Sequence, residues 1–223
     1  AKRAAPKARI FLVEEYITGP EVAMDFFVRD GELIFANAAY RLFHSFGIEA
    51  GHINPYRPSR ELLNLAQASA KKLGVTTGPF KADFICSPRH GWVLIEAATR
   101  LSGGWDSEMT CPLATGRDLV GAMADYALNN RISKRKLTVR QNKYACAYAP
   151  ILKPGKVVAW KVPENLPGLH KVIINSMDEI NPVDDCTKRP AFVITEGDNP
   201  YQAYRRALKA ANAIEVIYET VPV

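Results

Sequence analysis

Short apolar runs separated by turn residues fill much of the first half of the chain, a pattern typical of strands. Residues 10–17 (IFLVEEYI) are predicted to form a strand that ends near the turn sequence Thr18-Gly19-Pro20. Residues 21–28 and 32–38 are two further β-prone runs. The Asp-Gly pair between these two runs supplies the positive φ angles that a tight hairpin turn needs, so the sequence predicts a β-hairpin here.

A helix is predicted after a polar, Pro-containing loop around residues 51–59. Leucine and alanine recur at helical spacing up to Leu73. Ser59 can cap the first turn and Gly74 can end the last one, because a hydroxyl accepts from free backbone N–H groups and glycine tolerates the left-handed conformation. We therefore expect the helix to end at about Leu73.

Two more strands are expected at residues 79–87 and 92–97, which a short turn joins. A Gly-rich loop, LSGGWDSE, follows at residues 101–108, and this is where chemistry is expected. Apolar and polar residues then alternate at helical period over residues 113–130, which predicts one helix.

The second half changes to short strand-like runs broken by turns. Pro200 opens a last helix, predicted over residues 201–219. A basic connector at about 132–142 separates the two parts, so the chain is expected to be an α+β protein with subdomains at residues 10–132 and 143–223.

Composition restricts the class of protein. The chain has 223 residues, of which 48% are hydrophobic and 23% charged, which suits a buried core and excludes disordered and fibrous classes. No window approaches the run of about 20 apolar residues that a membrane span needs, and the N-terminus has no apolar secretory segment, so a cytoplasmic protein is expected. The four cysteines lack CxxC and zinc-finger spacing and are expected to be reduced. A net charge of +6 suits an anionic small molecule such as a nucleotide; a nucleic-acid-binding domain is the alternative, whose affinity would fall steeply with salt.

Two carboxylates are the main candidates for chemistry. Asp83 and Glu96 lie on adjacent predicted antiparallel strands, near Lys81 and Arg100. Two carboxylates on one face suit Mg²⁺, which keeps several waters and takes one or two protein carboxylates. The alternative is a solvated strand edge with paired surface charges. Trp105, Asp106 and Glu108, which follow the two glycines of the loop, could line a substrate pocket or lie in a surface loop with one anchoring aromatic.

The motifs of Rossmann, P-loop, serine-hydrolase and zinc-protease sites are absent from the sequence. The strings VEEYITGPE, GPFKADF and VLIEAATRLSGG occur in this order. They resemble, respectively, the hinge, the first metal-ligand strand and the E-x-N/A-x-R…GG motif of the ATP-grasp superfamily. The resemblance covers about residues 10–125, and the tail to residue 223 looks like the C-terminal part of amino-acid-ligase-like members. It implies an ATP-grasp C-terminal lobe, with a mostly antiparallel sheet and flanking helices, followed by a small mixed α/β subdomain.

The resemblance also implies roles for the hinge residues. Glu14 and the backbone from Glu15 to Ile17 would pair with the adenine edge of ATP. Glu21 would accept hydrogen bonds from the ribose hydroxyls. In the family, an N-terminal domain and a small ATP lobe precede this hinge, and we expect both to be absent from the chain.

Further along the chain, the resemblance implies that Asp83 and Glu96 bind Mg²⁺, for which Mn²⁺ could substitute, against the ATP phosphates. Lys81 would neutralise charge on the transferring phosphoryl group, and Arg100 would bind the substrate carboxylate or its acyl phosphate. Ala98 stands where many members have an asparagine that completes a second metal site. A second magnesium is therefore an open question.

The function expected from the resemblance is an ATP- and Mg²⁺-dependent ligase. It would convert a carboxylate to an acyl phosphate, with ADP released, for attack by an amine or thiol; amino acids are the first choice of substrate. The partners would be small-molecule carboxylates and amines, with no nucleic acid and no membrane, and a homodimer is compatible with this function. The alternative is a non-catalytic nucleotide-binding or interaction module, or one chain of a split enzyme.

Overall fold

The computed structural model describes residues 9–45 and 47–219. Eight strands form one antiparallel sheet in the order β5-β4-β1-β2-β3-β6-β10-β8. These strands are β1 (Glu21–Arg29), β2 (Glu32–Ser45), β3 (Ile48–Asn54), β4 (Gly78–Ser87), β5 (Gly91–Ala98), β6 (Tyr144–Tyr148), β8 (Leu169–Ile174) and β10 (Ala191–Gly197). A small second sheet contains β7 (Gly155–Lys161), β9 (Glu179–Ile180) and β11 (Glu215–Tyr218).

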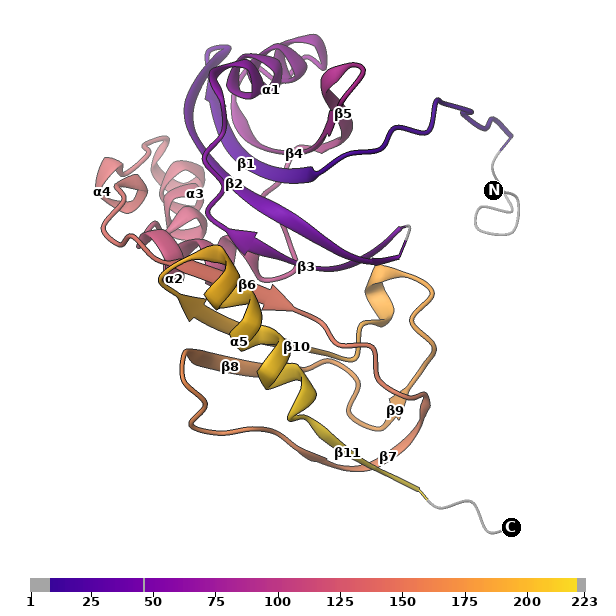
Figure 1. Ribbon diagram of the computed structural model, residues 1–223. Coiled ribbons are helices and arrows are strands. Elements are labelled where there is room, and N and C mark those ends of the chain that lie inside the picture. The colour runs from indigo at the N-terminus through magenta and orange to yellow at the C-terminus, as the bar shows by residue number, and fades with distance from the viewer. Residues whose placement is uncertain (1–8, 46, 220–223) are drawn as a thin grey trace.

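Helices flank the large sheet (Figure 1). They are α1 (Arg60–Lys72), the π-helix η1 (Asp106–Thr110), α2 (Cys111–Thr115), α3 (Leu119–Asn129), α4 (Lys134–Leu137), the 3₁₀ turn η2 (Cys186–Lys188) and α5 (Pro200–Asn212). The predicted α+β class, with a mostly antiparallel sheet and flanking helices, is confirmed. No helix within residues 9–45 and 47–219 has the length and apolar character that crossing a membrane would require.

The predicted local signals agree with the structure in the first half. β1 and β2 form the expected hairpin, and Asp30 and Gly31 in its turn have φ angles of 51° and 82°. The Ser59 hydroxyl accepts from the Leu62 N–H at 3.2 Å, and so caps α1 as expected. Gly74, with φ of 75°, follows the end of this helix.

Two predictions near the start of the chain are wrong. The strand predicted at residues 10–17 does not form, and Leu12 and Val13 are 84% and 96% exposed. No strand within the described residues pairs with this segment, and a strand requires such a partner for its backbone groups. The loop predicted from residue 51 begins later, because residues 51–54 belong to β3. Gly51 allows this, since a Cβ at that position would lie 1.9 Å from the Ala147 carbonyl oxygen on the neighbouring strand.

The two longest predicted helices are each shorter in the structure. Gly116, with φ of 72°, ends α2, and the Asp118 carboxylate then caps α3 by accepting from the Gly121 N–H at 2.8 Å. The helix predicted over 113–130 is therefore two helices. The last helix ends at Asn212, and residues 215–218 form β11 instead.

The alternation of side chains in β1 and β4 gives the sheet one apolar and one polar face. Helix α1 covers the apolar face, as Figure 1 shows. The residues of this core are at most 1% exposed and include Val22, Met24, Phe26, Leu62, Phe80 and Phe84. Successive side chains of a strand point to opposite faces, so Asp25, Lys81 and Asp83 lie on the other face of the sheet.

In the other half of the sheet, α5 packs on β6, β10 and β3, largely through buried alanines. The opposite face of β6 and β10 contacts Trp105 and Met109 from the Gly-rich loop and η1. The segment from residue 100 to residue 110 therefore crosses the face of the sheet on which the polar side chains of β1 and β4 lie.

Candidate functional site

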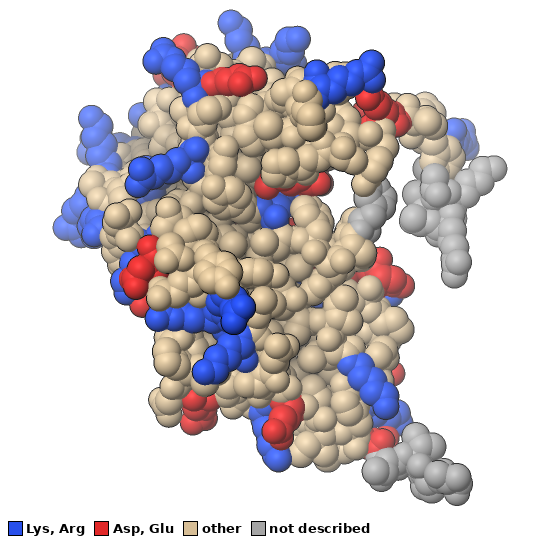
Figure 2. Space-filling model, viewed as in Figure 1, with Lys and Arg blue, Asp and Glu red and all other residues tan. Residues whose placement is uncertain are grey.

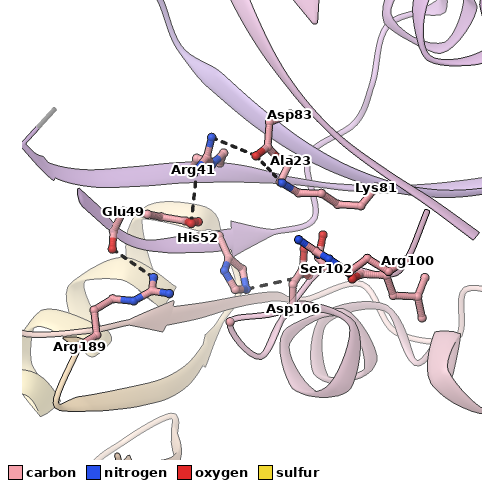
Figure 3. Close-up of a pocket in the computed structure, with 13 residues that line it drawn as sticks. Ala23, Arg41, Glu49, His52, Lys81, Asp83, Arg100, Ser102, Asp106 and Arg189 are labelled. Atoms are coloured by element: carbon pink, nitrogen blue, oxygen red, sulfur yellow. Dashed lines mark hydrogen bonds and ion pairs between the residues drawn. The ribbon is translucent and has the colours of Figure 1, made fainter. Parts of the chain in front are cut away.

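A cavity of about 360 Å³ lies between this polar face and the Gly-rich loop (Figure 3). Its wall includes four cations, three carboxylates and one histidine: Arg41, Lys81, Arg100, Arg189, Glu49, Asp83, Asp106 and His52. Ala23, Ser102, Gly103 and Gly104 leave space between them. Such a wall suits a small, highly charged ligand.

The structure brings the two predicted metal carboxylates together. Asp83 on β4 and Glu96 on β5 are register partners. The Lys81 ammonium contacts the Asp83 carboxylate and lies 3.5 Å from Oε1 of Glu96. Asp83 is buried, whereas the Glu96 side chain is 60% exposed.

Asp83 has one free oxygen. Its Oδ1 atom is buried and has no hydrogen-bond partner in the described part of the chain. Burial raises the pKa of this carboxyl, while Arg41 and Lys81 oppose the rise. A buried, unpartnered carboxylate oxygen is costly unless a ligand binds it, so Asp83 and Glu96 fit one Mg²⁺ that keeps most of its waters. No cluster of three or more His, Cys, Asp or Glu suited to a metal exists among the described residues, and Ala98 adds no oxygen ligand.

Arg41 joins three carboxylates, although none of the sequence motifs contains it. Its guanidinium lies 2.6 Å from Glu21, 3.3 Å from Asp83 and 3.4 Å from Glu49. These three carboxylates together raise the pKa of Arg41, although burial opposes the rise. The strand predicted over 32–38 ends too early to include it, because β2 continues to residue 45. An arginine between Tyr40 and Leu42 in a β-prone run is the signal that could have found it.

Asp25 attaches the Gly-rich loop to the sheet. Its Oδ1 accepts from the Ser102 N–H and its Oδ2 from the Ser107 hydroxyl, both at 2.7 Å. Burial, and then the nearby Asp106 carboxylate, raise the pKa of Asp25 to about 7. A lone acid inside the apolar run EVAMDFFV is the sequence signal from which this role could be predicted.

Of the three residues after the glycines, Asp106 is buried and lines the cavity. Trp105 packs against β6 and β10, and Glu108 is exposed, so neither is part of this wall. Its Oδ1 accepts from Nδ2 of Asn54 at 2.6 Å and from the Thr110 hydroxyl at 3.2 Å. His52 lies 3.9 Å from the same oxygen and 2.8 Å from the Thr110 hydroxyl. These contacts fix η1 against β3 at the floor of the cavity.

The predicted nucleotide residues share a second pocket of about 580 Å³. Its lining includes Glu14, Glu15, Ile17 and Glu21 together with β5 residues 93–95. Burial raises the pKa of Glu21, against the effect of Arg41.

Arg100, the other predicted catalytic residue, lies in the first cavity, where its Nη1 donates to the Leu101 carbonyl at 3.1 Å.

The two pockets meet at Arg41. This side chain contacts Glu21, which lines the second pocket, and Asp83, which lines the first. The site thus consists of two neighbouring pockets, one lined by the hinge segment and β5 and the other lined mainly by charged side chains.

Comparisons with known proteins address the identity of the fold. Residues 2–109 match the family model of the ATP-grasp domain. The chain is similar to a crystal structure of L-amino acid ligase from Bacillus licheniformis, with a TM-score of 0.76 and 19% identity, over 92% of this chain and 55% of that one. It is also similar to phosphoribosylglycinamide synthetase from Anaerococcus prevotii, with a TM-score of 0.75 and 16% identity, over 92% and 55% of the two chains.

A third similar structure is the biotin carboxylase domain dimer of Hydrogenobacter thermophilus 2-oxoglutarate carboxylase, in complex with MgADP, ADP and bicarbonate. Its TM-score is 0.67 at 19% identity, over 92% of this chain and 47% of that one. The chain thus spans about half the length of these structures. No curated protein sequence matches it. At these identities the structural likeness shows the fold alone.

Proposed function

We propose that the chain, whose residues 2–109 match the family model of the ATP-grasp domain, is the ATP-binding part of an ATP- and Mg²⁺-dependent ligase. The enzyme activates a carboxylate as an acyl phosphate, releases ADP and passes the acyl group to an amine. Amino acids are the substrates we propose first. One observation carries the proposal: the pocket lined by the hinge residues meets the charged cavity at Arg41, beside the paired carboxylates Asp83 and Glu96.

In this proposal the second pocket holds the nucleoside. The hinge segment from Glu14 to Ile17 and the apolar β5 residues 93–95 line the same pocket, so an adenine ring there could contact both backbone hydrogen-bonding groups and apolar side chains. Glu21 would accept from the ribose hydroxyls. The Arg41 contact at 2.6 Å orients its carboxylate for this role.

Charge neutralisation is the task of the first cavity. When bound by Asp83 and Glu96, Mg²⁺ would neutralise phosphate charge. Lys81 holds its ammonium between these carboxylates, where it can contact a phosphoryl oxygen. Arg100 offers a planar fork of donors that suits a carboxylate. Phosphoryl transfer requires positioning and charge neutralisation more than a protein nucleophile, which agrees with this set of residues.

A non-catalytic nucleotide-binding module, or one chain of a split enzyme, is the second candidate. One observation favours it: Ala98 offers no oxygen ligand for a second metal ion. Nucleic-acid binding receives no such support. Figure 2 shows Lys and Arg side chains scattered over the visible face with Asp and Glu among them, rather than gathered in one basic stripe.

The experiment measures ADP and phosphate release from MgATP by the natural-length protein, with and without a pool of free amino acids. Amino-acid-stimulated ADP release supports the ligase. Release of AMP and pyrophosphate contradicts an acyl-phosphate mechanism. No release with any carboxylate, together with binding of MgATP, supports the non-catalytic module.

Replacing Glu96 by glutamine tests the metal carboxylate. The change keeps the shape of an exposed side chain, so the fold should persist, while the charge that binds Mg²⁺ is lost. We expect ADP release to fall by about 100-fold or more, the range seen when one electrostatic contact to the transition state is removed. Glu179→Gln, an exposed glutamate on β9, is the matched control and should keep full activity. Unchanged turnover in Glu96→Gln would refute the assigned role.

A further inference from the structure

Arg189 lies at one end of the charged cavity. It comes from the segment between η2 and β10, far in sequence from the other residues of the wall. Figure 3 shows Arg189 and Arg100 at opposite ends of the cavity, with His52 and Asp106 between them. Neither the sequence motifs nor the proposed phosphoryl-transfer chemistry uses Arg189.

The Arg189 guanidinium is held in place by neutral groups. Its Nε donates to the Cys186 carbonyl at 2.7 Å and its Nη1 to the Glu49 carbonyl at 3.2 Å. Its Cζ lies 4.8 Å from the centre of the Phe192 ring. These contacts fix the orientation of the guanidinium and leave its charge unneutralised, so the group is preorganised for an anion.

The cations of the cavity differ in their partners. Arg41 and Lys81 each contact at least two carboxylates. Within residues 9–45 and 47–219, neither Arg100 nor Arg189 has a carboxylate within 4.0 Å. Among the described residues, the cavity therefore has two cations, at opposite ends, that have no carboxylate partner and can bind an anionic ligand.

We propose that Arg189 forms a second anion subsite, so that the substrate is a small acid with two carboxylates. This inference rests on the proposed function: Arg100 binds the carboxylate that is activated, and Arg189 binds the other. An arginine has five N–H donors, and two of those on Arg189 are used by carbonyls. The remaining ones suit the two oxygens of one carboxylate.

The surroundings favour a carboxylate over a phosphate at Arg189. The Glu49 carboxylate lines the same cavity, and it would repel a dianion more than a monoanion. A volume of about 360 Å³ is at the small end for ligand pockets, which suits an acid of a few carbon atoms.

The test compares each diacid with its monoamide, because the two differ in charge and scarcely in size. MgATP-dependent ADP release by the natural-length protein is measured with aspartate and asparagine, glutamate and glutamine, and succinate and succinamate. In the wild type we expect kcat/KM to be about 10- to 100-fold higher for one diacid than for its amide, mainly through KM, the range for a hydrogen-bonded charged group.

Arg189→Gln should lower kcat/KM for the diacid to the value for the amide. The loss for the amide should be much smaller than the loss for the diacid, and a melting temperature close to that of the wild type shows that the variant is folded. Arg189→Lys should restore part of the preference, since it keeps the charge without the fork. Arg205→Gln is the matched control, because this exposed arginine stacks on Tyr201 of α5 and is not part of the cavity wall.

The outcomes separate the inference from the proposed function. If diacids and amides stimulate ADP release equally in the wild type, the second subsite is wrong and the ligase stands. If Arg189→Gln lowers turnover of both equally, Arg189 is a structural residue and the subsite is again wrong. If no carboxylate stimulates ADP release, the proposed function fails and the inference fails with it.

Discussion

Asp25→Asn should make the protein more stable, and increasingly so as the pH rises. Asp25 is buried, and its pKa is raised to about 7 by burial and by Asp106. Asparagine can replace the protonated carboxyl with the same contacts. Its oxygen can accept from the Ser102 N–H, and its amide can donate to the Ser107 hydroxyl, which already lies 3.0 Å from the Ser102 carbonyl and can donate there instead.

The direction of this pH dependence follows from proton binding in the native and unfolded states. Because the pKa of Asp25 is higher in the native state than in the unfolded chain, the native state keeps a proton that the unfolded state has released at intermediate pH. The free energy of unfolding therefore falls as the pH rises from about 4 to about 7. A rise of the pKa from 3.8 to about 7 lowers the free energy of unfolding by about 4 kcal/mol when the carboxyl is fully ionised, at about 1.4 kcal/mol per pKa unit. This loss of stability is absent below about pH 4 and complete above about pH 7.

Urea unfolding of both proteins at about pH 5 and about pH 8 measures the effect. The variant should be more stable by about 1.5 kcal/mol at the lower pH and by about 4 kcal/mol at the higher one. Asp25 and Asp106 interact, so the difference reports the titration of the pair. Asp30→Asn in the exposed hairpin turn controls for the loss of one carboxylate. A gain that does not grow with pH, or a destabilisation at about pH 8, would refute the reasoning.

Two local features give further predictions. Gly51→Ala should lower the free energy of unfolding in urea by about 3 kcal/mol or more. The new Cβ would lie 1.9 Å from the Ala147 carbonyl oxygen, and the φ angle of 148° suits glycine. A loss below about 1 kcal/mol would show that β3 and β6 can separate without cost. Ser59→Ala should cost about 1 kcal/mol through loss of the cap on the Leu62 N–H, whereas Ser59→Thr should keep most of it; equal losses in the two variants would contradict the capping role.

The elements that the sequence predicts well are those whose signals are local. The Asp30-Gly31 turn and the Ser59 cap each involve residues a few positions apart, and both are present in the structure. The segment at residues 10–17 fails because its apolar and β-branched residues predict a strand, whereas strand formation depends on a partner that local patterning cannot provide. The helix predicted over 113–130 fails because Gly116 and Asp118 fit a helical period and also end one helix and begin the next.

The same distinction applies to the candidate site. Asp83 and Glu96 could be paired from sequence, since a short hairpin turn fixes which strands are adjacent. Arg41 and Arg189 could not, because they reach the cavity from β2 and from the second half of the chain. Sheet order brings them together, and the pairing of β3 with β6 that joins the two halves has no signal in local hydrophobic pattern.

The buried carboxylates of the polar face divide into two kinds, and this division indicates where a ligand binds. Both oxygens of Asp25 accept hydrogen bonds from the Gly-rich loop, and these bonds attach the loop to the sheet. The only free-energy cost of burying Asp25 is therefore that of burying its charge. Asp83 has one oxygen contacted by two cations and another with no partner in the described residues. Asparagine at position 25 should therefore stabilise the protein without any ligand. In the proposed function, Mg²⁺ and an anion would relieve the cost of burying Asp83, so MgATP should stabilise the wild type more than Glu96→Gln.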